Sequence, residues 1–119
     1  MPRVKRGVTS HRRHKKVLAL TKGHRASKHL LIRRATESMM HSLAYAYAHR
    51  RERKGDMRRL WITRINAASR AEGLTYGQFM HGLKQSGVDV NRKMLADLAV
   101  REPESFSGLV EMARQQDQG

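Results

Sequence analysis

Residues 27–54 read SKHLLIRRATESMMHSLAYAYAHRRERK, and this stretch decides the fold class. Its apolar residues recur at every fourth position, which is the spacing of one face of an α-helix: Leu31, Ala35, Met39, Leu43 and Tyr47. No proline interrupts the pattern, and Ser27 is a suitable N-cap. The pattern therefore predicts a helix of about 28 residues, roughly 42 Å long.

The end of this stretch and the residues after it are basic on every side. Residues 49–59 contain six cations: Arg50, Arg51, Arg53, Lys54, Arg58 and Arg59. Successive residues of a helix are rotated by about 100°, so these side chains point in all directions. Such a helix has no neutral face to pack on a protein, and its charge suits phosphates on several sides, as when folded RNA encloses it. Gly55 is a position where this helix could kink, because glycine within a helix costs about 1 kcal/mol relative to alanine.

Charge is divided unevenly between the two halves of the chain. The formal net charge is +15 over 119 residues. Residues 1–59 hold 18 lysine or arginine residues and 3 acidic ones, whereas residues 60–119 hold 7 of each. The whole excess therefore lies in the first half, which is typical of a nucleic-acid-binding arm joined to an ordinary domain.

Residues 1–28 are the most one-sided part of the arm, with ten lysine or arginine residues and no acidic one. The segment has too few apolar residues to offset its ordering entropy, so we expect it to be unfolded until it binds RNA. A short helix over about residues 10–20, ended by Gly23, is expected in the bound state. The alternative interpretations are a solvated tail, a localisation signal or a transit peptide, although the serine-rich bias of transit peptides is absent.

Residues 60–119 predict a small domain of helices. A broad apolar stripe runs from Leu60 to Ala68, and no convincing period-2 strand follows it. The signals that mark helix ends are Gly73, the capping box of Thr75 with Gln78, Gly87, Asn91 and Pro103. The expected core consists of Trp61, Ile65, Leu74, Tyr76, Phe79, Leu83, Leu95, Leu98, Phe106, Leu109 and Val110.

The expected fold is therefore all-α, with a long basic N-terminal helical arm followed by a small compact helical domain. The arm is residues 1–59, of which 1–26 are extended or a short helix and 27–59 are the long helix. The domain is residues 60–119. Its core is small, which suits a protein that its partner stabilises.

No pattern in the sequence indicates catalysis or a cofactor. Without cysteine there is no disulfide, thiolate metal site or cysteine nucleophile. His11 and His14 have the spacing of two metal ligands, but no nearby acidic residue completes a site. Neither a Gly-x-Ser-x-Gly turn nor a glycine-rich phosphate loop is present, and no apolar run reaches the length of a membrane span. We expect no enzyme, no metal, no cofactor, no small-molecule substrate and no membrane partner.

Several segments match the pattern of one known family. The most specific is RRLWITRINAA, residues 58–68, and the others are residues 1–7, 13–23, 45–47, 50–51, 73–76 with Phe79, 82–84 and 91–99. In these segments the chain resembles the bacterial large-subunit ribosomal protein family called L-twenty, over essentially its full length. The resemblance implies a structural constituent of the large (50S) subunit that binds 23S ribosomal RNA directly and is needed for subunit assembly. It implies a place in the cytoplasmic ribosome of a bacterium, with an organelle as the alternative.

The resemblance also implies partners and contact residues. The expected protein neighbours are the L-twenty-one and L-thirteen families, and in some members the C-terminal domain binds the leader of its own messenger RNA and represses translation. The expected RNA-binding residues are Arg3, Lys5, Arg6, Arg12, Arg13, His14, Lys15, Lys16, Lys22, His24, Arg25, Lys28, Arg33, Arg34, Arg50, Arg51, Arg53, Lys54, Arg58, Arg59, Arg64 and Asn66.

Four positions depart from the family pattern. Position 24 is usually aromatic and position 26 usually glycine, where this chain has His24 and Ala26. Positions 48 and 55 are commonly basic, where this chain has Ala48 and Gly55. These departures put one stacking contact, two phosphate contacts and the turn after residue 23 in question.

Two other classes of protein are alternatives to a ribosomal protein. A nucleoid-type DNA-binding protein would share the basic arm, but residues 92–98 are short and apolar for a recognition helix. A membrane-active cationic protein would need an apolar face opposite its basic one.

The roles of three aromatic residues are also undecided by the sequence. Trp61 is either a core residue or a base-stacking one. Tyr45 and Tyr47 point about 200° apart on a helix, so one could pack internally while the other touches RNA.

Overall fold

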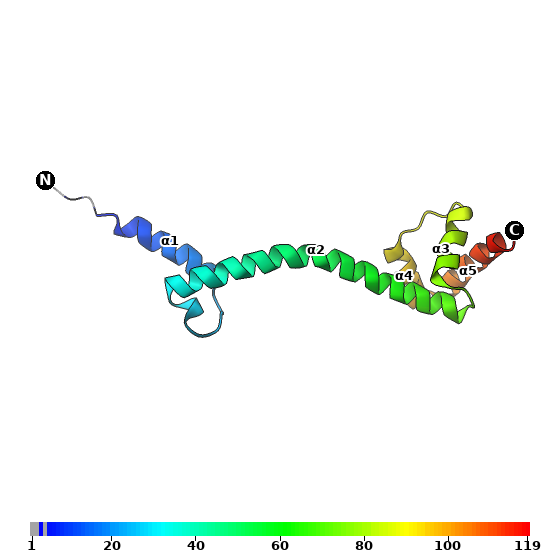
Figure 1. The fold of residues 1–119 in the computed structure, drawn as a ribbon, viewed down its shortest axis with the longest axis horizontal. Helices are drawn as coiled ribbons and strands as arrows, with labels where there is room; N and C mark the ends of the chain where they lie inside the picture. Colours follow the sequence, from blue (N-terminus) through cyan, green and yellow to red (C-terminus); the bar gives the residue numbers. More distant parts are fainter. Residues whose placement is uncertain (1–2, 4) are drawn as a thin grey trace. The chain divides into compact units, whose positions relative to one another are not determined.

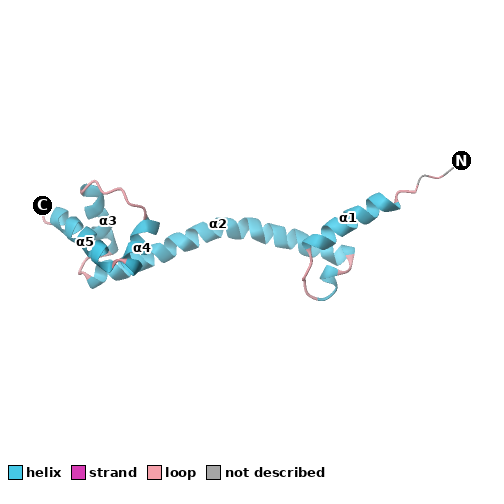
Figure 2. Ribbon diagram, turned by 180° about the vertical axis from the view of Figure 1, so that it is seen from behind, coloured by secondary structure: helices cyan, strands magenta, loops and turns pink. Residues whose placement is uncertain are grey.

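The structure is a computed structural model that describes residue 3 and residues 5–119. Met1, Pro2 and Val4, which belong to the opening family motif, lie outside the described residues. The all-α prediction is confirmed, since the described part of the chain contains helices and no strand (Figures 1 and 2). The elements are α1 Gly7–Leu20, the 3-10 helix η1 Ala26–His29, α2 Ile32–Ala71, α3 Tyr76–Gln85, α4 Arg92–Arg101 and α5 Pro103–Asp117. None of these helices has the length and apolar character needed to cross a membrane.

Contacts divide the chain into two units, and each is described by itself. Unit 1 is residues 1–51 and unit 2 is residues 52–119. The boundary lies within α2, which contributes residues 32–51 to unit 1 and residues 52–71 to unit 2. The division into an arm and a domain at residue 59 also falls within α2, and it remains a prediction about function.

Helix α2 differs from the predicted long helix at both ends. It has 40 residues and extends to Ala71, so the basic segment and the apolar stripe that follows belong to one helix. The helix runs through Gly55 without interruption. The prediction that Ser27 is its N-cap was wrong, because Ser27 lies in η1 and its carbonyl accepts the N–H groups of Leu30 and Leu31.

The turn between α1 and α2 is tight and explains where α2 begins. Helix α1 covers the predicted short helix and ends at the predicted residue, Leu20. Gly23 and Ala26 then take positive φ angles of 87° and 58°. Glycine adopts this conformation freely, but an alanine there costs about 1–2 kcal/mol. A glycine at position 26, which the resemblance implies, would therefore fit this turn better than Ala26, which keeps the conformation at a cost.

Local signals set the helix ends of unit 2 as predicted. The Thr75 hydroxyl accepts the N–H of Gln78, and the Gln78 side chain accepts the N–H of Thr75, which is the reciprocal capping box. After α3, Gly87 has a φ of 75° and donates to the carbonyl of Lys84, as expected for a glycine that ends a helix. The side chain of Asn91 caps α4, and Pro103 is the first residue of α5.

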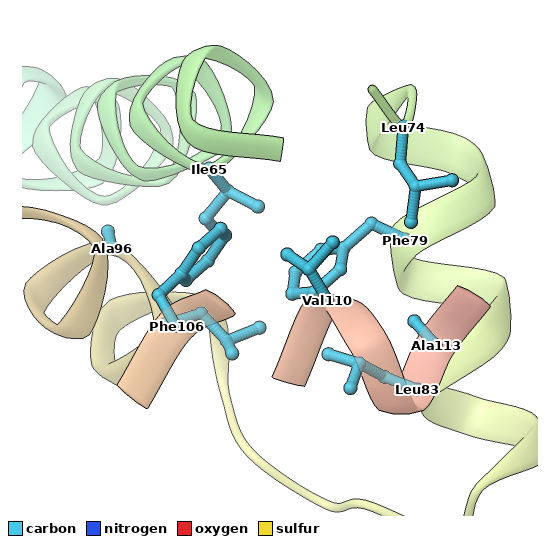
Figure 3. Close-up of a cluster of buried hydrophobic side chains, with 9 residues drawn as sticks. Ile65, Leu74, Phe79, Leu83, Ala96, Phe106, Val110 and Ala113 are labelled. Carbon is cyan, nitrogen blue, oxygen red and sulfur yellow. The ribbon is translucent and has the colours of Figure 1, made fainter. Parts of the chain in front are cut away.

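The core of unit 2 forms where α2, α3, α4 and α5 meet, as Figure 3 shows. Phe79 of α3 and Phe106 of α5 lie with their ring centroids 5.0 Å apart. The buried apolar residues are Ile65, Leu74, Phe79, Leu83, Leu95, Ala96, Phe106, Val110 and Ala113. Seven of these were predicted. Burying such side chains against one another is the main source of stability that this unit has.

The predicted core included some large side chains that are only partly buried and omitted small ones that are fully buried. Trp61, Tyr76 and Leu109 pack against the core but are only partly buried, and Leu98 is also only partly buried. The prediction omitted Ala96 and Ala113, which are buried because small side chains let helices approach closely. A close approach of α3 and α5 occurs at Gly82, which is buried against the backbone of α5.

Candidate nucleic-acid interface

The predicted contact residues of unit 1 lie along a sequence of elements that leave them open to solvent. Arg3, Lys5 and Arg6 precede α1 and are exposed. Helix α1 has no buried residue, and its four lysine and arginine side chains are exposed, whereas His14 is half-buried. The exposed cations of the turn and of the start of α2 are Lys22, Arg25, Lys28, Arg33 and Arg34. Unit 1 therefore presents its predicted cations to solvent, and only Arg34 forms an ion pair within the described residues, a 3.8 Å contact with Glu37.

His24 has a structural partner in this arrangement. Its Nδ1 lies 2.6 Å from the hydroxyl oxygen of Ser38 on α2, and its carbonyl oxygen accepts a hydrogen bond from His29 Nδ1 at 2.8 Å. The contact with Ser38 connects the turn to α2 across 14 residues of chain, and the contact with His29 lies within the turn. His24 therefore holds the turn against α2.

Two tyrosines and two histidines line the surface of α2 in unit 1. Tyr45 lies between His41 and His49, with ring centroids at 6.5 and 5.6 Å and nearly parallel planes. Tyr47 has the guanidinium of Arg51 over its ring, 5.5 Å from the centroid. Both tyrosines are exposed, so neither takes the internal position that the sequence left open for one of them. The exposed rings offer flat surfaces, and Tyr47 has a cation beside it, which is a chemistry that nucleic-acid bases accept.

The basic segment of α2 has no covered side. Every residue from Tyr47 to Leu60 is exposed, which is about four turns of helix, and the predicted cations Arg50, Arg51, Arg53, Lys54, Arg58 and Arg59 lie within it. One weak ion pair of 3.6 Å joins Arg59 to Asp56, and both side chains stay largely exposed. No contact within the described residues neutralises the other cations of this segment.

The remaining predicted residues, Arg64 and Asn66, lie on the last turns of α2. Arg64 is exposed. Asn66 is half-buried, and its side-chain oxygen accepts a hydrogen bond from Arg70 Nε at 3.1 Å. Asn66 therefore already has a partner for its acceptor, whereas its amide N–H groups are the part that an RNA acceptor could use.

Unit 2 contains a basic cleft that sequence analysis did not predict. It lies between α2 and the start of α4, has a volume of about 490 Å³, and is lined by Lys54, Gly55, Arg58, Trp61, Asn91, Arg92 and Lys93. A second cavity of about 490 Å³ shares Trp61, Asn91 and Lys93 with it and adds Arg64. Trp61 and Lys93 are 32 positions apart, so only the packing of α4 beside α2 brings them together. No local pattern in the sequence could have indicated this cleft.

A family model and individual relatives both match this chain, and their names indicate the same kind of protein. The family model described as "Ribosomal protein L20" matches residues 3–109. A relative from Dehalococcoides mccartyi, named "Large ribosomal subunit protein bL20", is 63% identical over 113 residues that cover 95% of each chain. Proteins of the same name from Moorella thermoacetica and Rhodospirillum centenum are 57% and 59% identical, over 97% and 96% of this chain and 95% and 96% of their own.

Proposed function

Because this chain belongs to the ribosomal protein L20 family and is a structural, non-enzymatic constituent of the large ribosomal subunit, we propose that it binds large-subunit ribosomal RNA directly and helps to assemble that subunit. Its place of action is the bacterial cytoplasmic ribosome. The exposed basic segment of α2 carries the proposal, since four turns of helix without a covered side have no partner within the described chain. A polyanion that surrounds the helix would neutralise these charges.

The expected contacts divide between the two halves of the chain. We propose that residues 1–59 supply most phosphate contacts, through the cations predicted from the sequence, and that residues 1–28 become ordered only on RNA. The absence of buried residues in α1 supports this, because such a helix gains little from its own packing. The compact part of the chain would then position the arm on the RNA.

Enclosure by RNA predicts that charge removal on any side of α2 weakens binding. Arg53, Arg58 and Arg59 divide the circumference of the helix into rough thirds, at about 0°, 140° and 240°. Each single change to alanine should weaken binding to a ribosomal RNA fragment by about fivefold, because each removes a charged hydrogen bond to phosphate. Affinities measured by filter binding at one fixed salt concentration give the comparison.

Glu52→Gln is the matched control for these three variants, since it lies on the same exposed segment and removes no cation. It should leave the affinity unchanged or slightly higher. A helix that docks by one face would show a defect for one or two of the arginines and none for the third. That pattern would contradict enclosure while leaving RNA binding itself intact.

A nucleoid-type DNA-binding role is the main alternative, and a competition between substrates separates it. The chain should bind a large-subunit ribosomal RNA fragment at least about 10³-fold more tightly than duplex DNA of equal length at the same salt concentration, which is the lower end of specific recognition. A small-subunit RNA fragment of the same length controls for general affinity to RNA. Equal affinity for all three nucleic acids would contradict the proposed function.

We also propose two finer partnerships that the family suggests. The neighbours in the assembled subunit would be the L-twenty-one and L-thirteen families, and the exposed apolar residues Val100 and Met112 of unit 2 offer surface for such contacts. Repression of its own message would require unit 2 to bind a structured messenger leader. The basic cleft beside Trp61 supports that second role, because it lies wholly within unit 2.

A further inference from the structure

We propose that the cleft between α2 and the start of α4 is a nucleotide-binding subsite, which takes one unpaired nucleotide of the bound RNA. The base would lie beside the indole of Trp61 and its phosphate beside Lys93 and Arg58. This inference rests on the proposed RNA-binding function and adds to it a defined pocket in unit 2, for a nucleotide that has left its helix.

The indole of Trp61 is fixed in place and yet accessible. Trp61 is the only tryptophan of the chain, is half-buried, and packs against the buried core of unit 2. It also lines both cavities. Stacking on a base costs less when the aromatic side chain is already held, because little side-chain entropy is lost on binding. A residue that only filled the core would have no surface in a cleft.

One stripe of α2 brings cations to the same cleft. Lys54, Arg58, Trp61 and Ile65 follow one another at spacings of four, three and four residues, so they share a face of the helix. Ile65 is fully buried in the core, whereas Arg58 and Lys54 are exposed and line the cleft. The face that anchors α2 in the core therefore continues past the indole to two cations.

Helix α4 supplies the opposite wall. Its first residues, Arg92 and Lys93, line the cleft together with Asn91. Arg92 is held by a hydrogen bond of 2.8 Å from its Nε to the hydroxyl of Tyr76. Asn91 already caps α4 through the N–H of Met94, and Lys93 is the second cation of this wall. Lys93 is exposed and forms no ion pair within the described residues.

The charge and size of the cleft fit a nucleotide. Five cations line the two cavities, against one carboxylate, Asp97, which is paired with Arg101 at 3.0 Å. Volumes of about 490 Å³ lie in the range of roughly 300–1,000 Å³ that small ligands occupy. Phosphate alone would not require the indole, and an acidic peptide would carry no ring to place beside it. An aromatic ring with a phosphate attached uses both features.

The fluorescence of Trp61 tests this assignment directly, because no other tryptophan contributes. Titration of the full chain with the large-subunit RNA fragment should quench the emission as a base stacks on the indole. Adenosine monophosphate, inorganic phosphate and a polyglutamate peptide serve as separate probes. Quenching by RNA and not by phosphate or polyglutamate is the expected result. Quenching by polyglutamate without quenching by RNA would assign the cleft to an acidic protein partner and overturn the proposal.

Two variants show whether the cleft contributes to affinity. Trp61→Leu and Lys93→Gln should each weaken RNA binding on the order of tenfold, the effect of removing one stacked base or one charged hydrogen bond. Lys84→Gln removes the same charge from an exposed position on α3 that lines neither cavity, and it should change affinity by less than about twofold. Urea unfolding of Trp61→Leu, followed by circular dichroism, separates reduced stability from reduced binding, and Lys93→Gln leaves the core untouched.

The double variant Trp61→Leu with Lys93→Gln completes the test. If both side chains hold one nucleotide, the second change should cost much less than it does alone. Additive effects would mean two separate contacts and would overturn a shared subsite.

The failure of the subsite can be told apart from the failure of the proposed function. Tight RNA binding by the unchanged chain, combined with Trp61 fluorescence that RNA does not quench and variants that do not change affinity, would reject the subsite alone. Absence of specific RNA binding by the unchanged chain would instead reject the proposed function. Quenching by adenosine monophosphate but not by RNA would show a site for free nucleotides and would also overturn the proposal.

Discussion

Replacing Gly82 by alanine should destabilise unit 2 by about 1–3 kcal/mol or more, the usual range for overpacking a tight contact. A Cβ at this position would lie 2.5 Å from the carbonyl oxygen of Ala113 and 2.7 Å from its Cα and Cβ. These atoms belong to the backbone and first side-chain carbon of α5, so no flexible side chain can move aside. Helix α5 would have to shift as a whole, which would open the core around Phe79 and Phe106.

The matched control is Gly108→Ala in α5, the helix that faces Gly82. A Cβ at Gly108 would meet no atom within 4 Å. Alanine should therefore stabilise the protein there by about 0.5–1 kcal/mol, through its better helix propensity. Urea unfolding monitored by Trp61 fluorescence measures both changes, since Trp61 packs against this core. A Gly82→Ala protein as stable as the original chain would contradict the close approach of α3 and α5.

The features predicted well from the sequence are those that local contacts determine. The caps at Thr75 and Asn91 each depend on a hydrogen bond spanning three residues. Pro103 starts α5 because its fixed φ angle suits a first helical position. The distribution of positive charge was also predictable, because it follows directly from the positions of lysine and arginine along the chain. These predictions needed no knowledge of tertiary contacts.

The features predicted poorly depend on residues that are distant in the sequence. The start of α2 is set by a turn in which His24 reaches Ser38, so the helical pattern alone placed it too early. The apolar stripe of α2 is covered at Ala35 but exposed at Leu43 and Tyr47, because nothing in the described chain packs on those two positions. Apolar periodicity indicates a helix, but it does not indicate what covers that helix.

Small residues in the core were missed for a related reason. Apolar patterns in a sequence point to large side chains, whereas Ala96, Ala113 and Gly82 are buried because helices meet there. The basic cleft was missed because its two walls come from α2 and α4, and each wall alone resembles an ordinary solvated helix surface. For Trp61, the core and binding interpretations turned out to be compatible, since one residue packs on the core and lines a cleft.

The second large effect concerns the salt dependence of RNA binding. If the arm binds the phosphates, the slope of log affinity against log salt concentration should fall by about 0.7 to 0.9 for every phosphate that is no longer bound. Replacing the ten lysine and arginine residues of positions 1–28 by glutamine should then reduce the slope by several units, and affinity at moderate salt by orders of magnitude. Glutamine keeps a good helix propensity, so α1 is not broken by the change itself.

A matched pair of triple variants removes the same charge from different places. Arg12, Lys15 and Lys16 are exposed on α1, and Arg70, Lys84 and Arg101 are exposed in unit 2. Changing either set to glutamine removes three positive charges and lowers the formal charge from +15 to +12. General attraction to RNA is therefore reduced equally in both proteins, and any difference between them reports where the phosphates bind.

The measurement that tests the central claim most directly is the salt slope of these two triple variants on one large-subunit RNA fragment. Direct phosphate binding by the arm predicts that the slope of the α1 variant falls by about 2 units, at roughly 0.7 per phosphate, whereas the unit 2 variant keeps the slope of the original chain. An unchanged slope for the α1 variant, together with a reduced slope for the unit 2 variant, would contradict the account. The compact half would then bind the phosphates, and the basic arm would not be the RNA-binding part of the chain.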